Sequence, residues 1–146
     1  MRLTSTLFAI SVLAAPASGQ EAVASFSIVP GETVTARIAA DPPGFVILSR
    51  DTVLAGGGEP APVAVGTVRF AFTSEGRQSM LRADNGYDRT FHYRAVMMRG
   101  DREMPTSICT VVPRVAGFES WPHRIDRLEL SSPHFVETTP GMISCQ

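Results

Sequence analysis

The longest alternation of apolar and polar residues in this chain lies between Gly66 and Met98. A period of two residues is that of a β-strand with one buried face. The chain is therefore restricted to folds built on strands, and the alternating apolar residues are the expected core. These residues are Val68, Phe70, Phe72, Phe91, Tyr93, Ala95 and Met97.

Shorter strand-like runs flank that stretch, and turn sequences rich in glycine, proline, asparagine and aspartate separate them. This spacing of about seven to eight short strands predicts an all-β fold, an antiparallel β-sandwich, with a small β-barrel as the alternative. The expected strands cover residues 25–29, 32–39, 45–48, 67–73, 78–83, 91–98, 106–112 and 124–130, with a short run at 135–136.

Three segments have special compositions. Phe45 to Leu48 is a continuous apolar run, which predicts a strand covered on both faces. Residues 55–63 contain three glycines and two prolines, and we expect a flexible surface loop there. Residues 113–122 hold Gly117 and two prolines, and we expect a long connection.

Asn85-Gly86 is the strongest short hairpin signal in the chain. It predicts that the strand before it folds back directly on the strand that begins at Phe91. A two-residue turn would place Met80 opposite Phe91, so that core faces core. It would also place Arg82 opposite Arg89, which is unfavourable. A four-residue loop avoids that contact, so the register stays open.

The N-terminus has the layout of a secretory signal peptide. Met1-Arg2 is a positive start, and Leu7 to Ala15 is a run of apolar and small residues. That run is about half the roughly 20 residues of a membrane-spanning helix, and no cysteine follows it for lipid attachment. We expect residues 1–19 to be a cleaved signal peptide. Residues 20–146 then form a single β-sandwich domain without a transmembrane segment, periplasmic or secreted.

The chain has two cysteines, Cys109 and Cys145. In an exported protein a small, even number of cysteines predicts a disulfide. Closing a loop of about 36 residues would stabilise the fold by roughly 3–4 kcal/mol in the chain-entropy model. The alternative, a reactive Cys109, lacks neighbouring groups that would lower the pKa of its thiol.

Charge and motifs exclude several classes of function. The formal net charge is −1, from 13 basic and 14 acidic residues, and without a basic patch nucleic acid is not an expected partner. The GxSxG and HExxH motifs are absent. Gly56-Gly57-Gly58 lacks the lysine of a phosphate-binding loop, and the spacing of His123 and His134 matches no standard zinc site. The sequence predicts no catalytic residue, no metal site and no cofactor.

Aromatic and polar residues in two expected loops are the candidates for a binding surface. Trp121 belongs to the long connection and lies near Arg124, and Asn85 and Tyr87 belong to the hairpin tip. Aromatic rings near a cation suit stacking on a sugar or contact with another protein. We therefore expect a non-catalytic binding or structural protein of the cell envelope, with a protein or carbohydrate as partner.

Two other functions stay open. The first is an envelope hydrolase with a site built on His92 or on a pair of carboxylates. The second is a barrel that carries an apolar ligand. The carboxylates that could form such a pair are Glu75, Asp101, Glu119 and Glu129.

Overall fold

The computed structural model describes residues 20–52, 60–137 and 142–146. The expected signal peptide lies outside the described residues, as do residues 55–59 of the glycine- and proline-rich loop. In the described part, all regular structure is β. That part of the chain contains no helix with the length and apolarity needed to cross a membrane.

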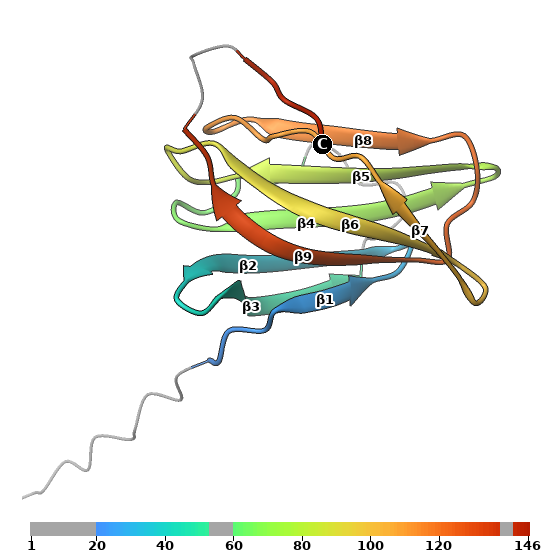
Figure 1. Ribbon diagram of the computed structural model, residues 1–146, viewed down its shortest axis with the longest axis horizontal. Coiled ribbons are helices and arrows are strands. Elements are labelled where there is room, and N and C mark those ends of the chain that lie inside the picture. Colours follow the sequence, from blue (N-terminus) through green and yellow to red (C-terminus); the bar gives the residue numbers. More distant parts are fainter. Residues whose placement is uncertain (1–19, 53–59, 138–141) are drawn as a thin grey trace, which may run out of the picture.

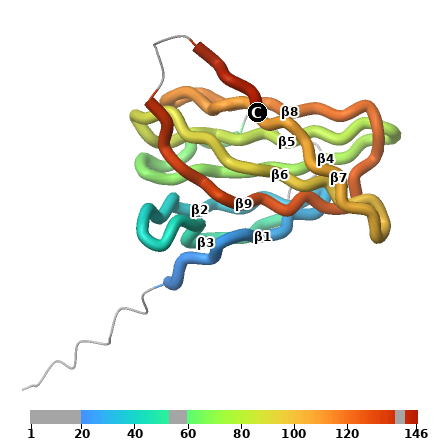
Figure 2. Tube along the Cα trace, in the orientation of Figure 1, coloured from blue at the N-terminus to red at the C-terminus, as the bar shows by residue number. Residues whose placement is uncertain are grey.

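The strands form two antiparallel sheets that lie face to face as two layers (Figures 1 and 2). The four-stranded sheet has the order β1 (Ser25–Ile28), β9 (Arg127–Phe135), β6 (Phe91–Arg99) and β7 (Arg102–Thr106). The five-stranded sheet has the order β3 (Pro43–Thr52), β2 (Glu32–Ala40), β4 (Val68–Glu75), β5 (Gln78–Asn85) and β8 (Ala116–Trp121). Because each sheet has two edge strands, these strands form two separate sheets and not the alternative barrel.

The expected alternation is confirmed in the strands that build the core. Phe70 of β4 and Phe91 and Tyr93 of β6 are all at most 1% exposed. The ring of Phe70 meets that of Tyr93 edge-on across the two sheets, with 5.1 Å between centroids. The two sheets therefore share one core, an arrangement consistent with the expected β-sandwich.

The hairpin predicted at Asn85-Gly86 is wrong. β5 pairs with β4 and β8, whereas β6 belongs to the other sheet, so Met80 does not face Phe91. The chain crosses between the layers at this dipeptide. A Cβ atom on Gly86 would lie 2.2 Å from the carbonyl oxygen of Ala64, so the glycine is required for close backbone approach and not for a two-residue turn.

The hairpin that β5 does form is with β4. Glu75 pairs with Gln78, and Gly76 has a φ of 57°. This left-handed conformation favours glycine and suits a two-residue turn. A turn at Gly76-Arg77 thus closes the β4–β5 hairpin and sets the register of the whole pair.

Three other segments differ from the expectation, and two of them form edge strands. β3 is longer than the predicted run and is not covered on both faces, since Leu48 is 36% exposed. Residues 107–112 make isolated pairings instead of the expected strand. Residues 116–121, predicted as a connection, form β8. β8 lies at the edge of the sheet, so only one of its ends is buried and its apolar pattern is weak.

The predicted disulfide joins Cys109 to Cys145. On either side of it the backbone N–H of Ile108 donates to Gln146 and that of Thr110 donates to Ser144, both at 2.8 Å. The C-terminal residues are therefore held along the segment that follows β7.

Candidate functional site

Three charged residues come together on the outer face of the five-stranded sheet. In β4 the residues on either side of Arg69 point into the core, so Arg69 points outward. Arg82 and Asp84 lie two positions apart on β5 and share its outer face. The register places Arg69 directly opposite Asp84. The carboxylate is therefore flanked by one cation across the strands and one along its own strand.

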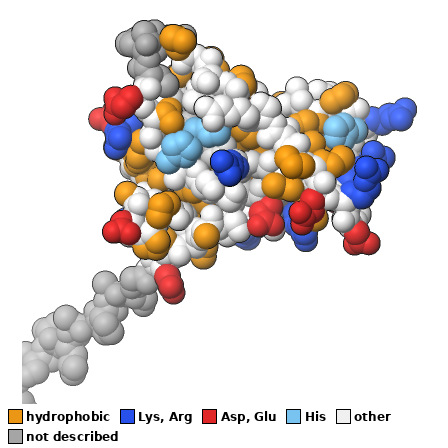
Figure 3. Space-filling view, viewed as in Figure 1, with side chains coloured by type: hydrophobic (Ala, Val, Ile, Leu, Met, Phe, Trp, Pro, Cys, Tyr) orange, Lys and Arg blue, Asp and Glu red, His pale blue; other side chains and the backbone are white. Residues whose placement is uncertain are grey.

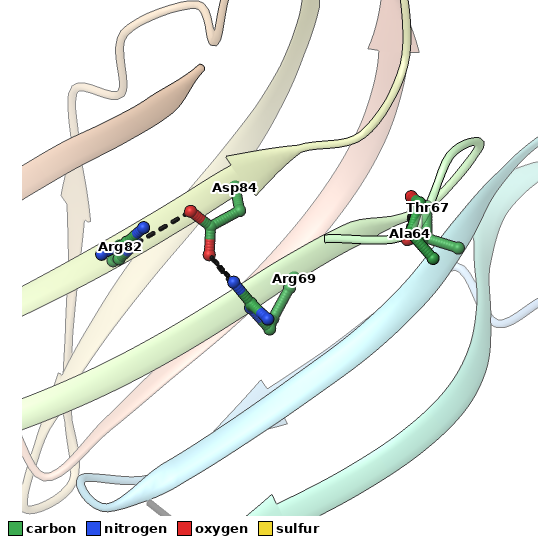
Figure 4. Close-up of polar contacts among 5 residues, drawn as sticks. All are labelled: Ala64, Thr67, Arg69, Arg82 and Asp84. Carbon is green, nitrogen blue, oxygen red and sulfur yellow. Dashed lines mark hydrogen bonds and ion pairs between the residues drawn. The ribbon is translucent and has the colours of Figure 1, made fainter. Parts of the chain in front are cut away.

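Each oxygen of the Asp84 carboxylate is bound by a different guanidinium group (Figure 4). Arg69 donates from Nε and Nη2 to Oδ2, at 3.0 and 2.9 Å. Arg82 donates from Nε to Oδ1, at 2.8 Å. Asp84 is 6% exposed, and buried carboxylates need such charge-assisted partners. The result is a fixed Arg69–Asp84–Arg82 cluster.

The cluster has hydrogen-bond donors to spare. A guanidinium group carries five N–H bonds, and Arg82 uses only its Nε–H on Asp84. Arg69 likewise keeps its Nη1 group. The two side chains retain 17% and 24% of their exposure. The salt bridges therefore orient both guanidinium groups, and both side chains remain partly exposed.

The cluster forms one wall of a pocket of about 450 Å³, here called the arginine pocket. Arg114 also lines the pocket, so the lining carries three arginines against one aspartate, a formal charge of +2. Apolar groups surround it: Val115 is 50% exposed and Phe118 is 57% exposed. The guanidinium carbon of Arg82 lies 5.5 Å from the centroid of the Phe118 ring. The other lining residues are Pro60, Ala61, Pro62, Val63, Asn85 and Gly86.

A turn at residues 64–67 fixes the remaining wall (Figure 4). The Oγ1 hydroxyl of Thr67 donates to the carbonyl of Ala64 at 2.7 Å. The N–H of Gly66 donates to Gly86, and the N–H of Gly86 donates to Thr67. These bonds join the turn to the end of β5, next to Asp84. The segment 60–63 is therefore held beside the cluster.

Two of the binding residues predicted from the sequence are buried and have structural partners. Asn85 is 1% exposed, and its Nδ2 group donates to the carbonyls of Arg89, Val111 and Val112 at 2.8–3.1 Å. Trp121 is 8% exposed, and its Nε1–H donates to Thr106 at 2.9 Å.

The other two predicted residues are more accessible. Tyr87 is half-buried, its hydroxyl accepts from the N–H of Ile38 at 3.0 Å, and its ring meets that of Phe135. Arg124 is exposed between β8 and β9.

The structure does not bring these four residues into one surface. Trp121 pairs with Ser79 at one end of β5, whereas Asp84 pairs with Ala116 at the other end. Ser79 and Asp84 are five positions apart along β5, which corresponds to roughly 17 Å. Asn85 alone lines the arginine pocket. The surface predicted from Trp121 and the Asn85-Gly86 tip is therefore divided between opposite ends of the sheet.

The groups named for a hydrolase are also dispersed. Glu119 lies on β8 and Glu129 on β9, in different sheets, and each already accepts a hydrogen bond, from the Cys109 N–H and from the Ser25 hydroxyl. His92 points away from the core but is only 5% exposed. Burial lowers its pKa below the usual 6.5, and the neighbouring His134 and Arg94 act in the same direction.

Arg69, Arg82 and Asp84 were not among the site residues predicted from the sequence. The signal was present, because a two-residue turn at Gly76-Arg77 places Arg69 opposite Asp84. The stronger turn signal at Asn85-Gly86 directed the pairing of β5 to the wrong strand.

Comparison with known proteins adds no assignment: no protein-family model, no curated protein and no solved structure matches this chain.

Proposed function

We propose that this protein is a non-catalytic binding protein of the cell envelope, and that the arginine pocket takes an anionic group of its ligand. The observation that carries the proposal is the unused donors of Arg69 and Arg82 beside a shared carboxylate. Guanidinium groups suit carboxylate and phosphate oxygens, because both oxygens of such a group can be bound at once.

The salt bridges contribute preorganisation. Arginine side chains lose rotamer freedom when they bind an anion, which weakens association. In this pocket Asp84 already holds two of the three arginines in place. The formal charge of the lining stays positive despite that aspartate. The ligand's anionic group would therefore meet oriented donors in a partly desolvated site.

The apolar residues at the border of the pocket favour a ligand that has an apolar surface as well as an anionic group. Val115 and Phe118 are exposed at the pocket or next to it, and an exposed aromatic ring beside a cation suits the face of a sugar or an apolar side chain. An acidic sugar or an acidic peptide has both features. This keeps the protein and carbohydrate classes expected from the sequence.

The hydrolase hypothesis receives less support. A general acid or base needs a carboxylate oxygen within reach of the substrate. Both oxygens of Asp84, the buried carboxylate at the pocket, are bound by arginine. We therefore place the protein's function in binding.

Export is part of the same proposal. The Cys109–Cys145 disulfide suits an oxidising compartment, and the N-terminal sequence has the signal-peptide layout. Mass spectrometry of the protein recovered from its native compartment tests this. We expect a chain that begins near Gln20 and lacks two hydrogens relative to the dithiol. An intact Met1 with two free thiols would contradict export.

Titration with inorganic phosphate and with acetate, followed by calorimetry in low-salt buffer, tests the pocket. We expect the wild type to bind at least one of these anions. Arg82→Gln and Arg69→Gln should each weaken it by about tenfold or more, since a hydrogen bond to a charged group contributes about 1.5–3 kcal/mol.

Arg94→Gln is the matched control, because Arg94 is an exposed arginine on the other sheet. It removes the same charge from the whole molecule and should leave anion affinity unchanged. Equal losses in all three variants would show a general charge effect and contradict a specific pocket. Absence of phosphate and acetate binding by the wild type would contradict it too.

A further inference from the structure

Two histidines face each other on the outer side of the four-stranded sheet. His92 of β6 and His134 of β9 are cross-strand partners, and their ring centroids lie 5.5 Å apart with the planes at 65°. In Figure 3, histidine side chains form a pale-blue patch over this face. Such a pair is independent of the arginine pocket, which lies on the other sheet.

A β-bulge creates the pairing. Arg94 pairs with Ser131, and His92 pairs with His134, so β9 contains one more residue than β6 between the two pairs. Ser132, within the bulge, has a φ of 52°, which is uncommon for a residue other than glycine. In an unbroken register Pro133 would lie opposite His92. The bulge thus redirects His134 onto His92, a use of bulges that is common near functional sites.

Each ring has one nitrogen held by a backbone carbonyl. The Nε2 atom of His92 lies 3.1 Å from the carbonyl oxygen of Ile108. The Nδ1 atom of His134 lies 3.0 Å from the carbonyl oxygen of Ser132. A carbonyl only accepts, so both of these nitrogens carry a proton when they form the bond. In the neutral rings the lone pairs are therefore on Nδ1 of His92 and Nε2 of His134.

Each ring thus has the second hydrogen bond that metal-binding histidines commonly make. A histidine ligand almost always donates its second ring N–H to a carbonyl or carboxylate, which fixes the tautomer and the ring orientation. With metal–nitrogen bonds of about 2.0–2.1 Å, two imidazoles on one ion have centroids roughly 4–6 Å apart. The observed 5.5 Å falls within that range.

We propose that His92 and His134 form a binding site for a divalent transition-metal ion. Imidazole suits Zn²⁺, Ni²⁺ and Cu²⁺, and Cu²⁺ binds most tightly to a given set of nitrogen ligands. Within the described residues no cluster of three or more histidine, cysteine or acidic side chains completes the site. Water or a group from a partner fills the remaining positions.

Two neighbours shape the affinity of the site. Arg94 acts electrostatically on His92, and its charge opposes a cation. Ile108, whose carbonyl orients His92, precedes Cys109 of the disulfide. The disulfide therefore supports the orientation of one of the two ligands.

Titration of the untagged, oxidised protein with Cu²⁺ in a non-coordinating buffer tests the proposal. We expect one Cu²⁺ per chain and an electron paramagnetic resonance spectrum with two nitrogen ligands. Two variants each remove one ligand: His134→Gln at an exposed position, and His92→Gln, which keeps a donor for the Ile108 carbonyl. Each should weaken Cu²⁺ binding by at least 10–100-fold, because losing only a hydrogen-bond partner of a metal ligand already has an effect of that size.

His123→Gln is the matched control, because His123 lies outside the pair and should not contribute. Arg94→Gln should tighten binding by roughly two- to fivefold at low salt. Circular dichroism checks that His134→Gln is folded. Copper affinity that is unchanged in both His92→Gln and His134→Gln would overturn the proposal, as would a wild type that takes up no Cu²⁺ at an equimolar concentration.

Discussion

The outer faces of the two sheets hold polar clusters of different origin. On the five-stranded sheet, Asp84 meets Arg69 across an unbroken register and Arg82 along its own strand. On the four-stranded sheet, His92 meets His134 only because a bulge shifts the pairing. Opposite charges stabilise the first cluster without a ligand. The two histidines of the second cluster do not attract each other, and a shared metal ion would stabilise their pairing. The two faces should therefore respond to different substitutions and ligands.

The disulfide offers the largest test of this difference. Replacing both cysteines with serine (Cys109→Ser and Cys145→Ser) removes a cross-link over a sequence separation of 36 residues without leaving a copper-binding thiol, and we expect the free energy of unfolding to fall by about 3–4 kcal/mol. Urea unfolding measures that loss. The bond lies next to Ile108, which holds His92, so Cu²⁺ affinity should fall while phosphate affinity is unchanged. Parallel losses at both sites would show that the two faces are not independent.

Asn85→Ala should have the next largest effect. The Asn85 amide satisfies the carbonyls of Arg89, Val111 and Val112 at the crossing between the sheets. Val111 also accepts from the Phe91 N–H, and the bonds to Arg89 and Val112 are only partly buried. Loss of the amide should therefore lower the free energy of unfolding by about 1–2 kcal/mol, measured by urea unfolding. Asn85→Asp has nearly the same shape but cannot donate. A stable Asn85→Asp variant would refute the structural role given to this amide.

Asp84→Asn separates stability from binding in the arginine pocket. It removes the carboxylate between two arginines, and we expect a loss of about 1–2 kcal/mol, because the guanidinium groups are partly exposed. The pocket then carries three cations and no internal anion. Phosphate should bind more tightly than to the wild type, with a steeper dependence on salt. Weaker binding would mean that orientation by Asp84 matters more than charge.

We expect acidification to have the smallest effect on stability, and to act through His92 on the four-stranded sheet. The pKa of His92 is lower in the folded protein than its usual 6.5, so the unfolded chain binds more protons below that pH. The free energy of unfolding should therefore decrease as the pH falls below 6.5 and level off below the folded pKa. Thermal unfolding at several pH values measures this. In His92→Gln the free energy of unfolding should depend less on pH over that range. If the pH dependence were the same as in the wild type, it would come from other groups.

The fold was more predictable than the candidate sites. Alternation at Phe70, Phe91 and Tyr93 reports burial directly, and those residues form the core. Strand pairing was harder, because Asn85-Gly86 has the composition of a hairpin but serves a crossing between sheets. The β8 strand was missed because an edge strand buries little apolar surface.

The two polar clusters were hidden for different reasons. The pairing of Arg69 with Asp84 follows from the turn at Gly76 once β4 is chosen as the partner of β5. The pairing of His92 with His134 depends on the left-handed conformation of Ser132. No residue preference in the sequence marks a serine for that conformation, so spacing rules for metal sites could not reveal the pair.

The pairing of β1 with β9 has a consequence for when the fold can form. Ser25 donates to Glu129 across a sequence separation of 104 residues, and among the described strands β1 pairs only with β9. Such distant contacts slow folding, because loop closure must precede any gain from the pairing. β1 can therefore complete its pairing only once β9 is available, so the four-stranded sheet closes late in folding. Stopped-flow refolding, followed by the fluorescence of Trp121, measures that rate.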